Sequence, residues 1–184
     1  QKGVLKHYNK WTKNYSMISF AIGHEISAPF INFVMAFNTI PANGKLLRPL
    51  LKESDPVEAF ENSIFSAATA EFLQKAMALV VDEGTGKNIR NARIGFAGKT
   101  GTARKWDRES ASYSKEKYLA SFIGYFPREN PKYTIGVFVD EPKESIYGGS
   151  VAAPVFKQIA ERLYHMELNK TTYIFREKDI AASK

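Results

Sequence analysis

The stretch from Gly95 to Ala103, which reads Gly-Phe-Ala-Gly-Lys-Thr-Gly-Thr-Ala, restricts the fold of this chain more than any other feature. A Gly-Lys-Thr triplet first suggests a phosphate-binding loop. Such a loop needs four residues between its first glycine and Gly-Lys-Thr, and Arg93 stands where that glycine should be. Gly101 would also weaken the helix that has to follow the loop. The stretch is therefore predicted to be a β-strand.

A strand at this position would sort its side chains onto two faces. Because side chains alternate, Lys99 and Gly101 point to one face, and Thr100 and Thr102 point to the other. Gly101 leaves room for an extended peptide to approach and pair with the strand. Lys99 adds a positive charge, and the two threonines add hydroxyl donors suited to a carboxylate. On spacing alone, an ordinary glycine-weakened strand with a surface lysine is the alternative.

Periodic apolar residues predict two helices before this strand. One covers residues 26–40 with Ser27 as its N-cap, and the other runs from an N-cap at Ser66 to a stop at residues 84–86. We expect both helices to lie in the core. Between them, residues 46–51 are predicted to form a short edge strand around a proline.

The second half of the chain has the composition of a sheet. Residues 94–103, 118–126 and 133–140 are β-rich runs of strand length, and the segment 127–131 is short enough to join the last two as an antiparallel hairpin. The polar residues 104–117 are expected to form a loop. With the helices, these runs predict an α+β fold in which an antiparallel sheet packs against helices.

A last helix should follow the sheet. Ser150 can cap it, and its apolar stripe over residues 151–164 should cover the sheet. Beyond Met166 the chain becomes polar and charged, so residues 1–165 are predicted to be a domain portion and residues 166–184 a polar C-terminal tail, mobile over its last ten or so residues.

Composition excludes several functions. The net charge of +7 comes from basic and acidic residues that are mostly interspersed, which argues against a nucleic-acid partner. The chain has no cysteine and three histidines far apart in sequence, so we expect no metal site and no cofactor. No apolar stretch is long enough to cross a bilayer, and the chain begins with Gln1 rather than methionine, so we treat it as a piece of a longer protein.

The segment from Lys99 to Thr102 resembles the third motif, Lys-Thr-Gly, of the penicillin-recognising serine transpeptidases. Its flanks strengthen the resemblance, because they occur in the order and spacing typical of class B penicillin-binding proteins. These flanks are Gly84-Thr85-Gly86, the segment 120–127, Asn130-Pro-Lys-Tyr133, Tyr147-Gly-Gly149 and the segment 152–156. The resemblance covers roughly residues 15 to 165.

The resemblance implies a partial penicillin-binding transpeptidase fold, similar to that of β-lactamases, and a reaction. In this family a serine attacks the penultimate D-Ala carbonyl of a peptidoglycan stem peptide, and the acyl group then passes to an amine of a neighbouring strand. Lys99 would organise the proton network of the site. Thr100 and Thr102 would bind the substrate carboxylate beside Gly101, with the Thr102 hydroxyl as the stronger candidate, and the Thr102 amide would be an oxyanion donor.

The family's first two motifs are missing. No Ser-x-Asn occurs, and the one Ser-x-x-Lys, Ser112 to Lys115, follows Lys-Thr-Gly instead of preceding it. We interpret it as a chance match. The chain alone should therefore supply one wall of an active site and no nucleophile, and it should be inactive.

By resemblance, the partners would be D-Ala-D-Ala stem peptides, β-lactams, the upstream half of the same protein, and divisome or elongasome proteins. The location would be extracytoplasmic, on the periplasmic face, with an inner-membrane anchor outside this sequence. Two alternatives stay open. One is a non-enzymatic module that binds peptidoglycan or a division protein, and the other is a D,D-carboxypeptidase or penicillin sensor of the same superfamily.

Overall fold

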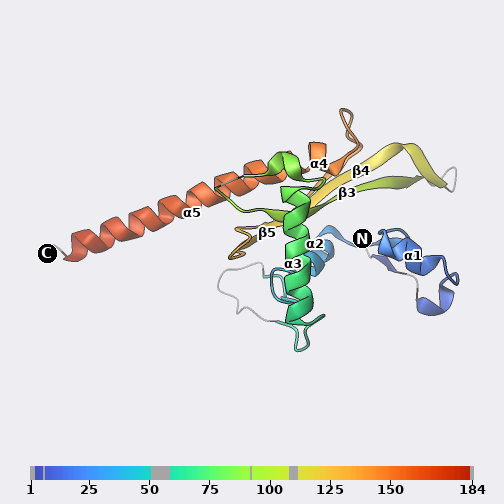
Figure 1. The fold of residues 1–184 in the computed structure, drawn as a ribbon, viewed down its shortest axis with the longest axis horizontal. Coiled ribbons are helices and arrows are strands. Elements are labelled where there is room, and N and C mark those ends of the chain that lie inside the picture. Colours follow the sequence, from blue (N-terminus) through green and yellow to red (C-terminus); the bar gives the residue numbers. More distant parts are fainter. Residues whose placement is uncertain (1–2, 6, 51–58, 92, 108–111, 183–184) are drawn as a thin grey trace.

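The computed structural model describes residues 3–5, 7–50, 59–91, 93–107 and 112–182, with side chains up to residue 168. Its centre is an antiparallel sheet of β3 (Ala97–Asp107), β4 (Ser112–Phe126) and β5 (Tyr133–Asp140), in the order β3-β4-β5. Helices pack against the sheet (Figure 1). The predicted α+β architecture is confirmed.

β4 is the middle strand, and its sequence reflects that position. Residues 119–126 are almost continuously apolar because both faces of the strand are covered by helices. Thr102 of β3 pairs with Ala120 of β4, and Phe126 pairs with Tyr133 of β5, so residues 127–132 form the predicted hairpin connection.

The predicted loop over residues 104–117 is wrong for residues 104–107 and 112–117, and residues 108–111 lie outside the described residues. β3 continues to Asp107 and β4 begins at Ser112, so the two strands form a long arm with a register shift between Arg104 and Trp106. Trp106 and Tyr113 pair across the arm in an edge-to-face arrangement, with ring centroids 5.3 Å apart. This aromatic pair stabilises strand pairing in a stretch whose polar composition resembles a loop.

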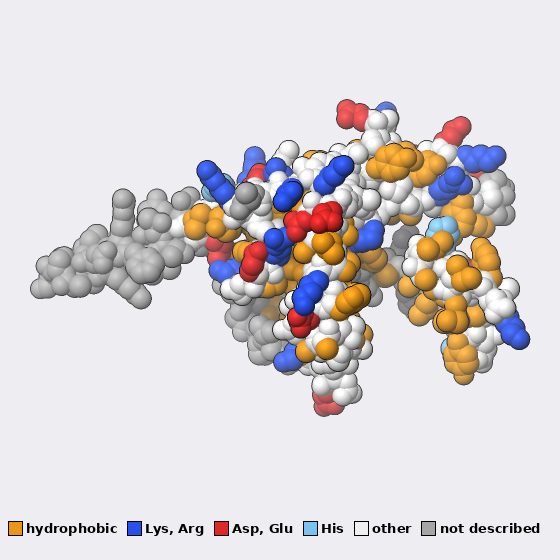
Figure 2. All heavy atoms as spheres, in the orientation of Figure 1, with side chains coloured by type: hydrophobic (Ala, Val, Ile, Leu, Met, Phe, Trp, Pro, Cys, Tyr) orange, Lys and Arg blue, Asp and Glu red, His pale blue; other side chains and the backbone are white. Residues whose placement is uncertain are grey.

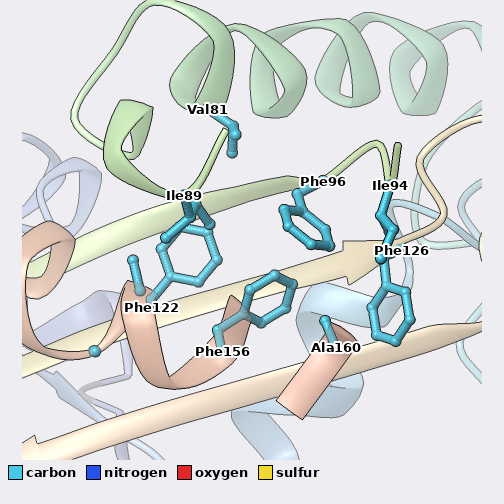
Figure 3. Packing of buried hydrophobic residues seen from close by; sticks show 10 residues of the cluster. Val81, Ile89, Ile94, Phe96, Phe122, Phe126, Phe156 and Ala160 are labelled. Carbon is cyan, nitrogen blue, oxygen red and sulfur yellow. The ribbon is translucent and has the colours of Figure 1, made fainter. Parts of the chain in front are cut away.

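The main core lies between one face of the sheet and α5 (Ala153–Ala182). Phe156 of α5 is fully buried against the rings of Phe96, Phe122 and Phe126, which point toward one another in Figure 3. Further contacts come from α4 (Gly148–Val151) and η2 (Lys87–Ile89). The last predicted helix therefore does cover the sheet.

That helical region begins earlier than predicted. α4 starts at Gly148, so Ser150 lies inside it rather than at its cap, and Pro154 falls in the first turn of α5, where a missing amide proton costs little. α5 continues past Met166 as one helix to Ala182. The division into a 1–165 portion and a 166–184 tail stays a prediction.

The opposite face of the sheet is covered by α2 (Phe30–Asn38). Phe30 and Phe33 both contact Phe138 of β5 edge to face, with ring centroids 5.0 and 5.6 Å from it. The predicted start of this helix is wrong. Pro29 occupies the N-cap, while Ile26–Ser27 forms strand β2, which pairs with β1 (Val4–Leu5).

The expectation that both early helices are core helices is wrong for α2, whereas α3 contributes Val81 to the main core. α2 has no fully buried residue, and Phe33 is 45% exposed. α3 (Ala67–Asp82) begins with the predicted cap, because Ser66 Oγ accepts a hydrogen bond from Thr69 N at 3.2 Å. It packs against β3 but buries fully only Ala70 and Val81.

Residues 46–51 do not form the predicted strand. Only Leu47 takes part in β-pairing, through an isolated bridge to Ala59, and Leu51 lies outside the described residues.

The N-terminal region carries a large amount of exposed apolar surface. It contains η1 (Tyr8–Lys10) and α1 (Ser16–Ala21). Figure 2 shows hydrophobic side chains gathered over this part of the molecule; Met17, Ile18 and Ile22 are among the exposed residues. None of the helices within the described residues combines the length and apolar character that a membrane span requires.

Candidate functional site

The predicted site residues lie in the middle of β3, which among the described strands pairs only with β4. The predicted alternation is present for Lys99, Gly101 and Thr102. Lys99 and Gly101 line a hollow of about 260 Å³ together with Phe33, Phe37 and Ile40, which belong to α2 and the turn after it, and Thr100 borders this hollow as well. Thr100 and Thr102 line a second hollow, of about 280 Å³, on the other side.

We call this second hollow the threonine pocket. Its lining residues are Thr85, Asn88, Thr100, Thr102 and residues 147–150. Three segments far apart in sequence therefore meet here: the loop after α3, the middle of β3 and the start of α4. Among the described residues, the lining contains hydroxyls, an amide and glycines and no carboxylate. A pocket rich in donors and free of negative charge is suited to an anion.

Side-chain hydrogen bonds join the three segments. Thr85 Oγ1 and Thr100 Oγ1 are 2.7 Å apart, and either oxygen can be the donor. Asn88 Nδ2 donates to the Gly149 carbonyl oxygen at 2.9 Å. The Gly148 amide donates to Thr102 Oγ1 at a longer distance of 3.4 Å. The two predicted threonines are thus held by residues from both neighbouring segments.

Glycines allow the segments to approach this closely. A Cβ at Gly148 would meet the main-chain oxygens of Gly101 and Ser121, and one at Gly149 would meet the Thr85 oxygen. Backbone atoms cannot rotate away, so a side chain at either position would force the start of α4 away from the sheet. The Tyr147-Gly-Gly149 turn is therefore part of the pocket wall.

Lys99 brings the positive charge of the site. Its side chain is exposed, and Nζ donates to the Thr100 carbonyl oxygen at 2.9 Å. Within the described part of the chain no carboxylate forms an ion pair with it. The ammonium group therefore stays available beside the strand edge to complement a negative ligand.

The structure also shows what the sequence did not reveal. Thr85 and Asn88 contribute to the pocket, although the sequence indicates Gly84-Thr85-Gly86 only as a helix stop and a flank of the motif, and it does not indicate Asn88. The sequence does offer one indication of Thr85. Gly84-Thr85-Gly86 and Tyr147-Gly-Gly149 both flank the Lys-Thr-Gly motif. Among the residues that the structure describes, no three histidine, cysteine or acidic side chains cluster as a metal site would require.

The sheet, its covering helices and the Lys-Thr-Gly strand together define the class of penicillin-recognising transpeptidases. The family model described as "Penicillin binding protein transpeptidase domain" matches residues 1–161. The chain belongs to this family, and its relatives place it among the class B penicillin-binding proteins.

Two relatives and one solved structure illustrate the similarity. "Probable peptidoglycan D,D-transpeptidase PenA" of Neisseria flavescens is 34% identical over 161 residues, which are 85% of this chain and 39% of that protein. Stage V sporulation protein D of Bacillus subtilis is 33% identical, over 76% of this chain and 23% of its own length. The apo transpeptidase domain of Burkholderia pseudomallei penicillin-binding protein 3 superposes with a TM-score of 0.76 and 28% identity, covering 89% of this chain and 50% of that one.

The chain therefore spans well under half the length of the relatives it matches. A shared region of this size includes the Lys-Thr-Gly strand and the pocket beside it. The family's second motif, Ser-x-Asn, does not occur in this sequence, and the one Ser-x-x-Lys, Ser112 to Lys115, follows Lys-Thr-Gly instead of preceding it.

Proposed function

We propose that this chain is the C-terminal part of a serine-type peptidoglycan D,D-transpeptidase, which cross-links cell-wall stem peptides through an acyl-enzyme and is acylated by β-lactams. The observation that carries the proposal is the threonine pocket. Thr100 and Thr102 present hydroxyls next to a strand edge with no strand partner among the described residues, and Lys99 adds a cation nearby. The relative from Neisseria flavescens carries the name of the same activity.

The roles of the site residues follow from donor chemistry. A stem peptide ends in a carboxylate, and this group accepts hydrogen bonds from Thr100 and Thr102 while the extended peptide lies along β3. The Thr102 amide is one donor to the oxyanion that forms when the serine attacks. One such donor lowers the barrier by about 3 to 4 kcal/mol. Lys99 supports the proton network and the negative charge of the ligand.

This chain supplies no nucleophile of its own. Ser112 and Lys115 belong to β4, whereas a Ser-x-x-Lys pair acts together when a helix places residues three apart on one face. In β4 the intervening Ser114 accepts hydrogen bonds from the amides of Glu116 and Lys117. The chain alone is therefore expected to be inactive, and the nucleophile belongs to a preceding segment of a longer protein.

The location and further partners are part of the same proposal. A peptidoglycan substrate requires the extracytoplasmic side of the inner membrane, with an anchor in a segment outside this sequence. Divisome or elongasome proteins are the corresponding assembly partners. A non-enzymatic binding module and a D,D-carboxypeptidase or penicillin sensor are the alternatives, and the names of the relatives favour the transpeptidase.

The test is acylation by a fluorescent penicillin. The longer protein that carries this chain is expected to form a stable adduct on a serine upstream of Gln1, whereas the isolated chain is expected to remain unlabelled. A longer protein that binds peptidoglycan but is never acylated would support the non-enzymatic module. An adduct on Ser112 would show that the Ser-x-x-Lys of β4 is functional after all.

A further inference from the structure

We propose that Thr85 is a positioning residue that sets the direction of the hydrogen bonds in the threonine pocket, so that Thr100 donates its proton to the bound carboxylate. This inference rests on the proposed function, because the carboxylate belongs to the same acyl-donor peptide. Thr85 lies in the loop between α3 and η2 and has no part in the chemical steps given above. Its Oγ1 is 2.7 Å from Thr100 Oγ1.

The argument begins with the single proton of a hydroxyl group. Thr100 can donate one hydrogen bond and can accept others. If it donates to Thr85, its proton is used inside the protein and its lone pairs face the pocket. If Thr85 donates to Thr100, the Thr100 proton is free to point at a ligand. A carboxylate has no proton to offer, so it binds well only to the second arrangement.

Thr102 also accepts a hydrogen bond from a donor within the protein. The Gly148 amide, which can only donate, is directed at Thr102 Oγ1 at 3.4 Å. Thr102 therefore accepts in this contact, and its own proton remains free. Both threonines can then donate to the same anion, each supported by a protein donor. Hydrogen bonds arranged in series polarise one another, so the donor behind a hydroxyl strengthens the bond that the hydroxyl makes.

The position of Thr85 is fixed by backbone contacts on both sides. The Gly84 amide donates to the Leu79 carbonyl oxygen at 2.9 Å, and the Gly86 amide donates to that of Val80 at 2.9 Å. The Thr85 carbonyl lies against Gly149, whose own oxygen accepts from Asn88. The end of α3 and the start of α4 therefore hold the Thr85 hydroxyl opposite Thr100.

The prediction is tested in the longer protein that carries this chain, by the second-order rate constant of acylation. Thr85→Val keeps the shape of the side chain and removes the hydroxyl, and it should slow acylation about five- to tenfold, the effect of one hydrogen bond. Thr85→Ser should stay within about twofold of the parent.

Thr69→Val is the matched control. Thr69 Oγ1 forms a similar exposed hydroxyl pair with Ser66 at 3.0 Å, at the opposite end of α3 from the pocket (Figure 1). This variant loses a comparable bond and should acylate at the parental rate. A Thr69→Val variant that slows acylation as much as Thr85→Val would overturn the specific role of Thr85.

A second readout separates positioning from a merely structural role. A β-lactam with a free carboxylate is compared with its methyl ester. Thr85→Val should slow the reaction of the carboxylate form and change that of the ester by less than about twofold, because the ester carries no charge for the aligned hydroxyls. Equal losses for both forms would contradict the inference.

Binding distinguishes a failure of the inference from a failure of the proposed function. An absence of acylation in the parent protein would refute the proposed activity. The Thr85 inference is then decided by the affinity for an acyl-D-Ala-D-Ala peptide and for its C-terminal amide. Thr85→Val should weaken binding of the carboxylate peptide about five- to tenfold and leave that of the amide unchanged. Unchanged affinity for both peptides would overturn the inference.

Discussion

Gly148 at the start of α4 lies directly against the main-chain oxygen of Gly101 in β3. The contact joins two backbones, so neither partner can avoid an added methyl group by changing a rotamer. It brings the Tyr147-Gly-Gly149 turn next to the motif strand and closes one wall of the threonine pocket.

The first prediction concerns this contact. Gly148→Ala should push α4 away from β3, lower the free energy of unfolding by about 1 to 3 kcal/mol and slow acylation of the longer protein at least about tenfold. Denaturant unfolding and the acylation rate measure the two effects. The control is Gly23→Ala, because Gly23 has a positive φ of 81° but nothing within 4 Å of an added Cβ. It should cost about 1 kcal/mol through backbone strain alone and leave acylation unchanged.

The second prediction concerns the carboxylate site. Thr102→Val in the longer protein should slow acylation by carboxylate-bearing β-lactams roughly tenfold to a hundredfold, because a hydrogen bond to a charged group contributes about 1.5 to 3 kcal/mol. Thr102 is exposed, so the thermal unfolding midpoint should change little. A variant that folds normally and acylates at the parental rate would show that this hydroxyl does not bind the carboxylate.

The third prediction concerns the core under α5. Phe156→Ala removes a fully buried ring that contacts Phe96, Phe122 and Phe126, and it should lower the free energy of unfolding by about 3 to 5 kcal/mol. Phe72→Ala provides the contrast, since Phe72 is 71% exposed in this chain, and its effect should stay within about 0.5 kcal/mol. Denaturant unfolding of the isolated chain measures both, and similar losses for the two variants would contradict the burial pattern.

The fourth prediction concerns stability at high pH. Burial raises the pKa of the Tyr125 hydroxyl from its usual 10.0 to about 12. Because the folded-state pKa is the higher one, the folded state keeps a proton that the unfolded state releases. The resulting stability is complete below pH 10 and is lost as the pH rises to about 12, with a slope of about 1.4 kcal/mol per pH unit.

Tyr125→Phe should remove this contribution. The stability of the variant should fall less steeply with alkaline pH than that of the parent, and the parent's tyrosinate absorbance should include a tyrosine that ionises near pH 12 and that the variant lacks. Parallel stability curves for parent and variant between pH 10 and 12 would contradict the assignment.

The sequence predicted the features that depend on local pattern. The strand around Lys99 and the cap at Ser66 were found because alternation and capping chemistry act over a few residues. The burial of α2 could not be predicted in the same way. An apolar stripe shows that a helix has one face to cover, but the extent of coverage depends on other segments. Phe33 contacts Phe138 and is still 45% exposed.

Two other features depend on contacts that are distant in sequence. The arm of β3 and β4 has the polar sequence composition of a loop. It forms strands because of cross-strand pairs such as Trp106 and Tyr113. The threonine pocket needs Thr85, Thr100 and Gly149 together, and no short-range rule predicts that these three residues meet.

One edge of β3 has no strand partner among the described residues, and this edge has a consequence for handling this chain. Exposed main-chain donors and acceptors along a strand are a template for any extended chain, including a second copy of the same one, and thus for aggregation. Lys99 and Arg104 place exposed positive charges along this strand. When two copies approach edge to edge these charges repel each other, whereas a negatively charged peptide terminus is attracted. The same side chains that favour a ligand thereby act as gatekeepers against self-association.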